Sequence, residues 1–158
     1  MKVLICGGAG YIGSHMVKLL FHKGYSPVVF DNLSTGNRWT LKWGDFYQGE
    51  LLNPEDLQDV FSQHQFSAVM HFSARSLVGE SVTNPALYYQ NNVTGTLNLL
   101  QAMQQAGVSQ FIFSSTAATF GSPVTDRIAE DHPQRPINPY GWTKLMVERI
   151  LQDYAAAY

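Results

Sequence analysis

Residues 6–13 read Cys6-Gly7-Gly8-Ala9-Gly10-Tyr11-Ile12-Gly13, and this glycine-rich stretch decides the expected fold. The apolar run over residues 2–5 predicts a buried strand before it, and the pattern over residues 14–23 predicts an amphipathic helix after it. Glycines spaced G-x-x-G-x-x-G between a strand and a helix are a variant of the dinucleotide-binding fingerprint, in which bare backbone approaches a pyrophosphate. The stretch therefore predicts a phosphate-binding turn, with an ordinary glycine-rich turn as the alternative.

The composition indicates a globular protein. The chain has 158 residues, of which 45% are hydrophobic and 14% charged, and it contains one cysteine, so an internal disulfide is excluded. The net charge of −2 gives no basic field for nucleic acid and no basic stripe for a membrane surface. No apolar run approaches the length of a membrane span, and no leader pattern precedes the first strand. We expect a cytoplasmic protein without nucleic-acid, membrane or metal partners.

Apolar runs alternate with helical patterns along the whole chain, which is typical of βαβ units and a parallel sheet. The expected fold class is therefore α/β, a doubly wound parallel sheet of the Rossmann type. Residues 32–44, 73–83 and 115–139 are predicted to be loops. Further strands are predicted over residues 27–31, 46–48, 68–72 and 110–114, and further helices over residues 54–64, 84–107 and 140–157.

Several buried-looking residues have a purely structural interpretation. Trp39 and Trp43 are interpreted as core aromatics beneath the first of these loops. His71 lies inside a predicted strand and is interpreted as a packed, hydrogen-bonded side chain rather than a ligand. Asn91 and Asn92 fall in the middle of a predicted helix, where burying an amide is costly. Either one of them faces a polar partner or both lie on the solvated face.

Tyr140 and Lys144 are the strongest candidates for chemistry. They are four residues apart at the start of the last predicted helix, so they share one face of it. An ammonium group near a phenol favours the phenolate and lowers the tyrosine pKa, which suits a general base. The pair follows the fifth predicted strand, whose carboxyl end lies at the ligand-binding edge of such sheets. A surface pair without function is the alternative.

Polar residues at two strand ends complete the pattern. Ser114-Ser115-Thr116 end the fifth strand, where one hydroxyl can bond a substrate hydroxyl and relay its proton to Tyr140 while the others cap the strand end. Asp31 ends the second strand, where it can accept the hydroxyls of an adenine ribose. Its charge would repel a 2′-phosphate, which favours NAD over NADP.

Seven segments resemble the extended short-chain dehydrogenase/reductase family and, within it, the UDP-hexose 4-epimerases. The resemblance covers all 158 residues and implies bound NAD, with UDP-glucose and UDP-galactose interconverted through a transient 4-keto sugar. The segments are GGAGYIGSH (7–15), FDNLS (30–34), VMHFSA (69–74), VGESV (78–82), YYQNNVTGT (88–96), FIFSSTAATFG (111–121) and NPYGWTKLMVE (138–148).

The resemblance also implies roles by motif position. Tyr140 would take the proton from the sugar 4-hydroxyl, Lys144 would hold the nicotinamide ribose, and Thr116 occupies the catalytic Ser/Thr position. Together with the glycine turn and Asp31, the expected cofactor-binding residues are Gly7, Gly10, Tyr11, Ile12, Gly13, Asp31, Asn32, Ser34, Thr35, Gly36, Glu50, Leu51, Phe72, Ser73, Ala74, Asn91, Ser114, Tyr140 and Lys144.

The sequence departs from the family pattern at a few positions. Glu50 stands where an aspartate usually reaches the adenine, and Ser76 stands where a related epimerase has a lysine on the cofactor. Ala117 and Ala118 stand where sugar-nucleotide 4,6-dehydratases carry two acids that eliminate water. The missing acids favour an epimerase over a dehydratase.

The resemblance implies a parent protein about twice as long. Residues 1–158 would be its NAD-binding domain, and the last strands and the substrate domain would follow. A UDP-hexose substrate and a homodimer are expected for the full-length protein. The alternatives are an NAD-binding fragment without turnover and another nucleotide-sugar enzyme of the family, such as a dehydratase or a decarboxylase.

Overall fold

The computed structural model describes all residues 1–158, which fall into two compact units. The first unit comprises Met1–Ser73 and Leu97–Ser114, and the second comprises Ala74–Thr96 and Ser115–Tyr158. All the strands belong to the first unit, so the expected sheet and the glycine turn lie in one compact body.

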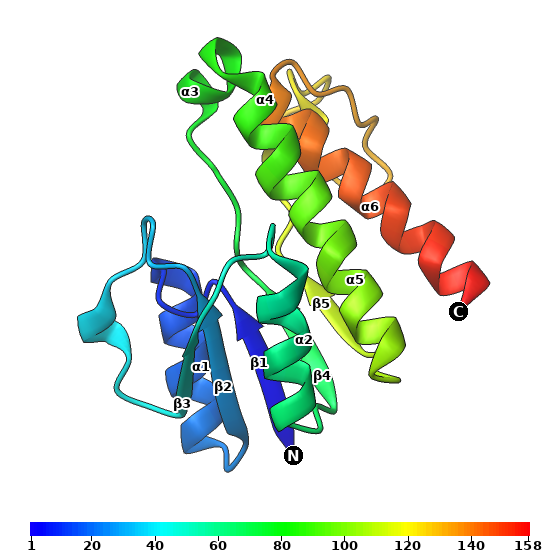
Figure 1. The fold of residues 1–158 in the computed structure, drawn as a ribbon. Coiled ribbons are helices and arrows are strands. Elements are labelled where there is room, and N and C mark those ends of the chain that lie inside the picture. Colours follow the sequence, from blue (N-terminus) through cyan, green and yellow to red (C-terminus); the bar gives the residue numbers. More distant parts are fainter. The chain divides into compact units, whose positions relative to one another are not determined.

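Five parallel strands form the sheet, in the order β3-β2-β1-β4-β5 (Figure 1). Cys6 at the end of β1 lies opposite Phe30 on β2 and His71 on β4. The strand order therefore reverses at β1, and ligands of open α/β sheets bind outside the carboxyl ends of strands at such a point. The predicted Rossmann-type fold is confirmed. The strands are β1 (Lys2–Cys6), β2 (Ser26–Asp31), β3 (Asp45–Gln48), β4 (Ala68–His71) and β5 (Phe111–Phe113).

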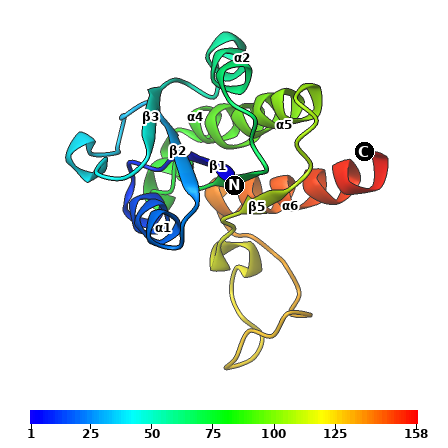
Figure 2. The same ribbon diagram turned by 90° about the horizontal axis from the view of Figure 1, so that it is seen from below.

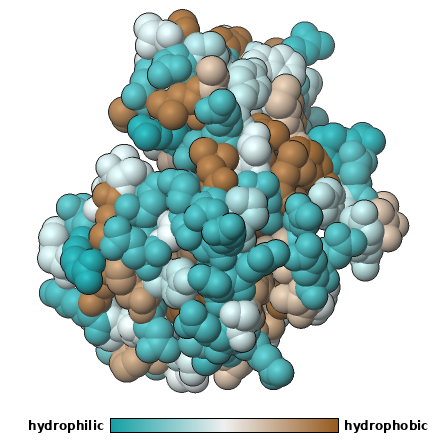
Figure 3. All heavy atoms as spheres, in the orientation of Figure 1, coloured by the Kyte–Doolittle hydropathy of each residue, from teal (hydrophilic) through white to brown (hydrophobic).

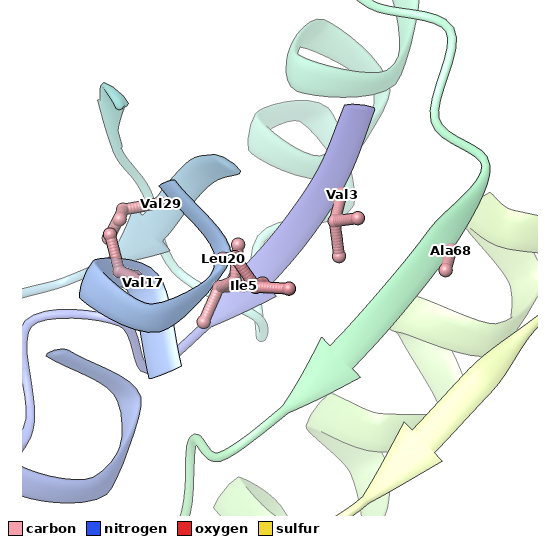
Figure 4. Close-up of a cluster of buried hydrophobic side chains, with 6 residues drawn as sticks. All are labelled: Val3, Ile5, Val17, Leu20, Val29 and Ala68. Atoms are coloured by element: carbon pink, nitrogen blue, oxygen red, sulfur yellow. The ribbon is translucent and has the colours of Figure 1, made fainter. Parts of the chain in front are cut away.

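Helices cover both faces of this sheet. Figure 2 shows α1 (Tyr11–His22) on one face and α2 (Pro54–Gln63) and α5 (Gly95–Gln105) on the other. The outward face of α2 is mostly hydrophilic in Figure 3, as expected for a helix that buries one side. Because both faces of the sheet are covered, its strands are almost continuously apolar. The core under α1 is drawn in Figure 4 and consists of Val3, Ile5, Val17, Leu20, Val29 and Ala68.

Local signals set the helix ends in this unit. The Asn53 side chain accepts a hydrogen bond from the backbone N–H of Glu55 at 3.2 Å, which confirms the predicted start of α2. Gly24 follows α1 with a φ of +81°, a conformation that favours glycine, and confirms the predicted stop. α1 begins at Tyr11, three residues before the predicted position, because the glycine turn runs directly into the helix.

The second unit contains α3 (Val78–Thr83), α4 (Pro85–Tyr88), a π-helical turn (Tyr89–Thr94), a 3-10 turn (Ala117–Phe120) and α6 (Pro139–Ala157). Two expectations are wrong here. The predicted loop over residues 73–83 contains α3, and the predicted single helix over residues 84–107 is interrupted by the π-helical turn. α3 forms because the hydroxyl of buried Tyr88 accepts from the Leu77 N–H at 3.1 Å and lies 2.7 Å from a Glu80 carboxylate oxygen.

The packing expected of two side chains is confirmed, and one interpretation is wrong. His71 is buried and its ring lies 5.9 Å from the rings of both Phe111 and Phe113, which confirms that it is packed. Trp43 packs against the core under α1, as expected. Trp39, by contrast, is 72% exposed. No helix combines the length and the apolarity needed to cross a membrane.

Candidate active site

The glycine turn holds three stretches of backbone closer together than any side chain would allow. Gly7 has a φ of +80°, and a Cβ on it would lie 2.5 Å from the backbone nitrogen of Ser73. A Cβ on Gly13 would lie 2.1 Å from the carbonyl oxygen of Gly7. The Gly7 N–H donates to the Phe30 carbonyl at 2.9 Å, which fixes the turn on the end of β2. Glycine is therefore required at both positions.

The first turn of α1 presents free backbone N–H groups. Its N-cap residue is Gly10, which has no side chain to accept from them, and the turn contains no acidic residue. Tyr11 and Ile12 are 83% and 57% exposed, so this helix end is open. An uncapped, exposed helix N-terminus beside bare glycine backbone is suited to bind a phosphate group.

Gly13→Ala is expected to lower the free energy of unfolding by about 1–3 kcal/mol, because the added methyl group must displace the Gly7 carbonyl. Urea unfolding measures this loss. Gly79→Ala is the matched control, since a Cβ there meets nothing within 4 Å and its φ is negative. An equal change in both variants would contradict the close contact.

Asp31 connects β2 to the glycine turn. It is buried, and its two carboxylate oxygens accept hydrogen bonds from the backbone N–H groups of Ala9 at 3.0 Å and Leu33 at 2.8 Å. A Cβ on Gly36 would lie 2.9 Å from one of these oxygens, so the following loop folds closely over the carboxylate. Each oxygen keeps a second lone pair that can accept a ribose hydroxyl. Leu33 adopts a φ of +60°, which is strained for leucine and is held by this bond.

Asn32 and Glu50 join the ends of β2 and β3. The Asn32 amide donates to the Glu50 carboxylate at 2.6 Å, and its oxygen accepts from the Ser34 N–H at 2.9 Å. Leu51 is buried, and its carbonyl accepts from the Asn98 amide at 3.0 Å. The glutamate therefore takes a defined place at this end of the sheet although the family pattern expects a shorter side chain.

The remaining predicted residues of the first unit follow β4 and β5. The Phe72 N–H donates to the Cys6 carbonyl at 2.8 Å, and the Ser114 N–H donates to the His71 carbonyl at 3.1 Å. The first unit thus places fifteen of the predicted residues on or directly after the carboxyl ends of its strands. These are Gly7, Gly10, Tyr11, Ile12, Gly13, Asp31, Asn32, Ser34, Thr35, Gly36, Glu50, Leu51, Phe72, Ser73 and Ser114.

The other predicted residues, Ala74, Asn91, Thr116, Tyr140 and Lys144, belong to the second unit. Tyr140 and Lys144 lie one turn apart on α6, as predicted. The helix start is fixed by the Asn138 side chain, which accepts from the Gly141 N–H at 2.8 Å. Lys144 is only 3% exposed, and burial lowers the pKa of its ammonium to about 8.

Thr116 lies close to the start of α6. Its hydroxyl oxygen accepts from the Ala118 N–H at 3.2 Å and caps the 3-10 turn. A Cβ on Gly141 would lie 2.5 Å from the Ala118 carbonyl oxygen, so this turn rests against the first turn of α6. The second unit therefore brings the segments that carry Thr116 and Tyr140 into contact.

Asn92 is a positioning residue whose partners sequence analysis missed. It is 2% exposed, and its amide donates to the Thr143 hydroxyl and to the Arg75 carbonyl, both at 3.0 Å. Its oxygen accepts from the Arg75 N–H at 2.8 Å. Thr143 in turn donates to the Tyr140 carbonyl at 2.7 Å. The expectation that one mid-helix asparagine faces a polar partner is confirmed, and the signal was its cost of burial.

Glu148 is a second such residue, two turns beyond Tyr140 on α6. Its carboxylate accepts from the Ser115 hydroxyl and, at 2.7 Å, from the Gln134 amide. Ser115 and Gln134 lie near opposite ends of the connection over residues 115–139. One carboxylate therefore fixes both ends of the segment that carries Thr116, which no local pattern predicts.

The chain is similar to known nucleotide-sugar enzymes. A family model described as GDP-mannose 4,6 dehydratase matches residues 4–158. The UDP-glucose 4-epimerase of Rhizobium leguminosarum bv. trifolii is 51% identical over 152 residues, which cover 96% of this chain and 46% of that protein. The chain spans about half the length of the curated relatives it matches.

Solved structures agree closely. The UDP-glucose 4-epimerase of Brucella ovis in complex with NAD matches with a TM-score of 0.97 and 51% identity, over 99% of this chain and 48% of that chain. The Thermotoga maritima enzyme with UDP-glucose matches with a TM-score of 0.95 and 38% identity, over 100% of this chain and 52% of that chain.

Proposed function

Because the chain belongs to the GDP-mannose 4,6 dehydratase family, we propose that it is the NAD-binding, base-bearing half of an enzyme that interconverts UDP-glucose and UDP-galactose. The observation that carries the proposal is the pair of Tyr140 and buried Lys144 on one face of α6, next to the turn capped by Thr116. The three similar proteins described above are UDP-glucose 4-epimerases, which supports this reaction over others of the family.

The residues of the first unit fit a dinucleotide. The glycine turn leaves no room for a Cβ, the first turn of α1 is uncapped, and Asp31 has free lone pairs at the end of β2. These features would hold a pyrophosphate and an adenine ribose respectively. When bound, NAD supplies the reversible oxidation at C4 of the hexose.

The residues of the second unit supply proton transfer. The phenolate of Tyr140 would take the proton of the sugar 4-hydroxyl. It would later return the proton to the same oxygen, once C4 has the opposite configuration. Lys144 stays protonated in most molecules at pH 7, because its pKa is about 8. Its charge favours the phenolate on the same helix face. Thr116, held beside the helix start, would bond the same sugar hydroxyl and orient it.

The two alternatives to this proposal are a dehydratase and a cofactor-binding fragment without turnover. A dehydratase is disfavoured because Ala117 and Ala118 provide no acid in the turn after Thr116, where the groups that eliminate water are expected. A cofactor-binding fragment without turnover is favoured by the half-length match.

Incubating the purified chain with NAD and UDP-galactose distinguishes epimerisation, dehydration and cofactor binding without turnover. Formation of UDP-glucose supports epimerisation by the chain itself. NAD binding without product indicates that turnover needs the remainder of the parent protein, and a dehydrated product contradicts the proposal. Turnover by the full-length parent is the decisive measurement.

NAD is expected to bind at least about tenfold more tightly than NADP, because the buried Asp31 carboxylate repels a 2′-phosphate. Asp31→Asn should weaken NAD about tenfold and narrow this difference. It should also cost about 1 kcal/mol of stability, since one amide oxygen cannot accept from both backbone N–H groups. Calorimetric titration measures the affinities, with Asp45→Asn, at the opposite end of the sheet, as control. Equal affinity for both cofactors in the unmutated chain would contradict this role.

We further propose that residues 1–158 form the NAD-binding domain of a longer, homodimeric protein that acts in the cytoplasm. The half-length match to the relatives supports a further domain, and the resemblance to a family that pairs through two long helices supports a dimer. Light scattering on the full-length protein tests the dimer.

A further inference from the structure

An exposed tryptophan beside the glycine turn has no role in the proposed function. Trp39 lies in a 3-10 turn (Arg38–Thr40) of the loop between β2 and β3, and it is 72% exposed. Figure 1 shows this loop as the cyan segment beside α1. The expected dinucleotide contacts lie earlier in the loop, between Asn32 and Gly36. A large exposed aromatic at a hollow in the surface is typical of a binding site.

The hollow is a pocket of about 310 Å³ between the outer face of α1 and this loop. Its volume is at the lower end of the range for small-molecule sites. It begins at the glycine turn, where Gly10 and Tyr11 line it, and extends along α1 to Lys18, two helical turns further along the helix. Its main side chains are three aromatic and three basic ones: Tyr11, Trp39, Trp43, His15, Lys18 and Lys42.

The pocket is formed by residues 9–43, a part of the chain with more basic than acidic residues, although the whole chain has a negative net charge. Residues 1–44 contain five lysines and arginines but only one acid, whereas the whole chain has a net charge of −2. That acid, Asp31, is buried and bonded to two backbone N–H groups, so it does not neutralise the lysines. No aspartate or glutamate lines the pocket. Lys18 holds its ammonium 5.3 Å from the ring centre of Trp43, over the aromatic wall.

We propose that this pocket binds an aromatic anion at a site that adjoins the dinucleotide site at Gly10 and Tyr11 and extends beyond it along α1. A planar ring would stack on the exposed indole of Trp39, and a phosphate or carboxylate on that ring would face Lys18, which lies over Trp43, and Lys42. The lysines exclude the other ligand class that aromatic pockets take, because they would repel an organic cation. The inference does not depend on the proposed function.

Phenyl phosphate is the probe, observed through the indole N–H signals of the 15N-labelled chain by NMR. Trp39 and Trp43 line the pocket, and Trp142 on α6 is an internal control. Phenyl phosphate should shift the first two signals saturably and bind about tenfold more tightly than phenol or inorganic phosphate alone. Saturating NAD should leave this affinity unchanged. Equal shifts at Trp142, no saturation, or displacement by NAD would overturn the proposal.

Variants locate the contacts. Lys18→Gln and Lys42→Gln should each weaken phenyl phosphate about twofold to fivefold, as expected for exposed charges. Lys23→Gln is the matched control, because Lys23 ends the same helix outside the pocket. Trp39→Ala should weaken phenyl phosphate but leave inorganic phosphate unchanged. An equal effect of Lys18→Gln and Lys23→Gln would reduce the binding to general charge attraction and overturn the site.

Discussion

Tyr140→Phe is expected to lower the turnover number of the full-length enzyme by about a hundredfold to ten-thousandfold, the usual contribution of a positioned general base. NAD affinity should not change, because the variant keeps the ring and loses only the hydroxyl. The effect should fall on kcat and not on KM, since the phenolate acts on the proton that leaves during the reaction.

The structure makes this variant a clean test. The first turn of α6 is held by the Asn138 cap and by the Thr143 hydroxyl on the Tyr140 carbonyl, and neither bond involves the phenol. The helix therefore keeps its position when the phenol is removed. Tyr154→Phe, further along the same helix, is the matched control and should turn over normally. Unchanged turnover in Tyr140→Phe would remove Tyr140 from its role as base.

The first unit was largely predictable because its signals are local. The glycines of residues 7–13, the Asn53-Pro54 helix start and the Gly24 stop each act within one turn of backbone. Such short-range signals can be recognised in the sequence, and they set the residues at which strands and helices begin and end. Even so, no local pattern indicated that Asp31 accepts hydrogen bonds from the backbone N–H groups of Ala9 and Leu33, because those bonds depend on how the loop closes.

The second unit was less predictable because its order depends on distant partners. Asn92 and Thr143 are 51 residues apart, and Ser115 and Glu148 are 33 apart. α3 was missed for the same reason, since the buried Tyr88 hydroxyl that supports it lies in the next helix. For Trp39 the prediction of burial was wrong, because it rested on apolar character alone and the loop turns the side chain towards solvent.

These long-range bonds bear on the proposed chemistry. The base, its lysine and the Thr116 turn lie on segments that local propensity alone would leave loosely related. Asn92 and Glu148 fix them with buried or charged hydrogen bonds. The proposed active residues thus depend on positioning residues that carry no recognisable chemistry of their own.

As the pH falls from 10.5 to 7, the stability of Lys144→Met relative to the original chain is expected to rise by about 3 kcal/mol. Burial lowers the pKa of Lys144 from 10.5 to about 8, so the folded protein binds this proton less tightly than the unfolded chain does. Each unit of such a difference corresponds to about 1.4 kcal/mol. Methionine has a similar length and no titratable group, so the variant lacks this linkage.

The sign of the pH dependence follows from the same linkage. Below pH 8 both states are protonated and the folded state carries the whole penalty. Between pH 8 and 10.5 the folded state loses its proton first, so the penalty fades as the pH rises. The stability of Lys144→Met relative to the original chain should therefore be greatest at or below pH 7 and fall as the pH rises towards 10.5.

Urea unfolding of both proteins across this pH range measures the difference. Comparing the two is essential, because burial also raises the pKa of the Cys6 thiol and raises the pKa of Tyr88 to about 12. Both groups lower stability at high pH, equally in variant and original. Lys23→Met, at an exposed position, is the matched control. A stability difference between Lys144→Met and the original chain that stays constant across this pH range would contradict the lowered pKa of Lys144. A difference that falls as the pH rises would mean that the charge of this lysine is held at a cost in stability, as expected of a residue retained for its charge on the helix face that it shares with Tyr140.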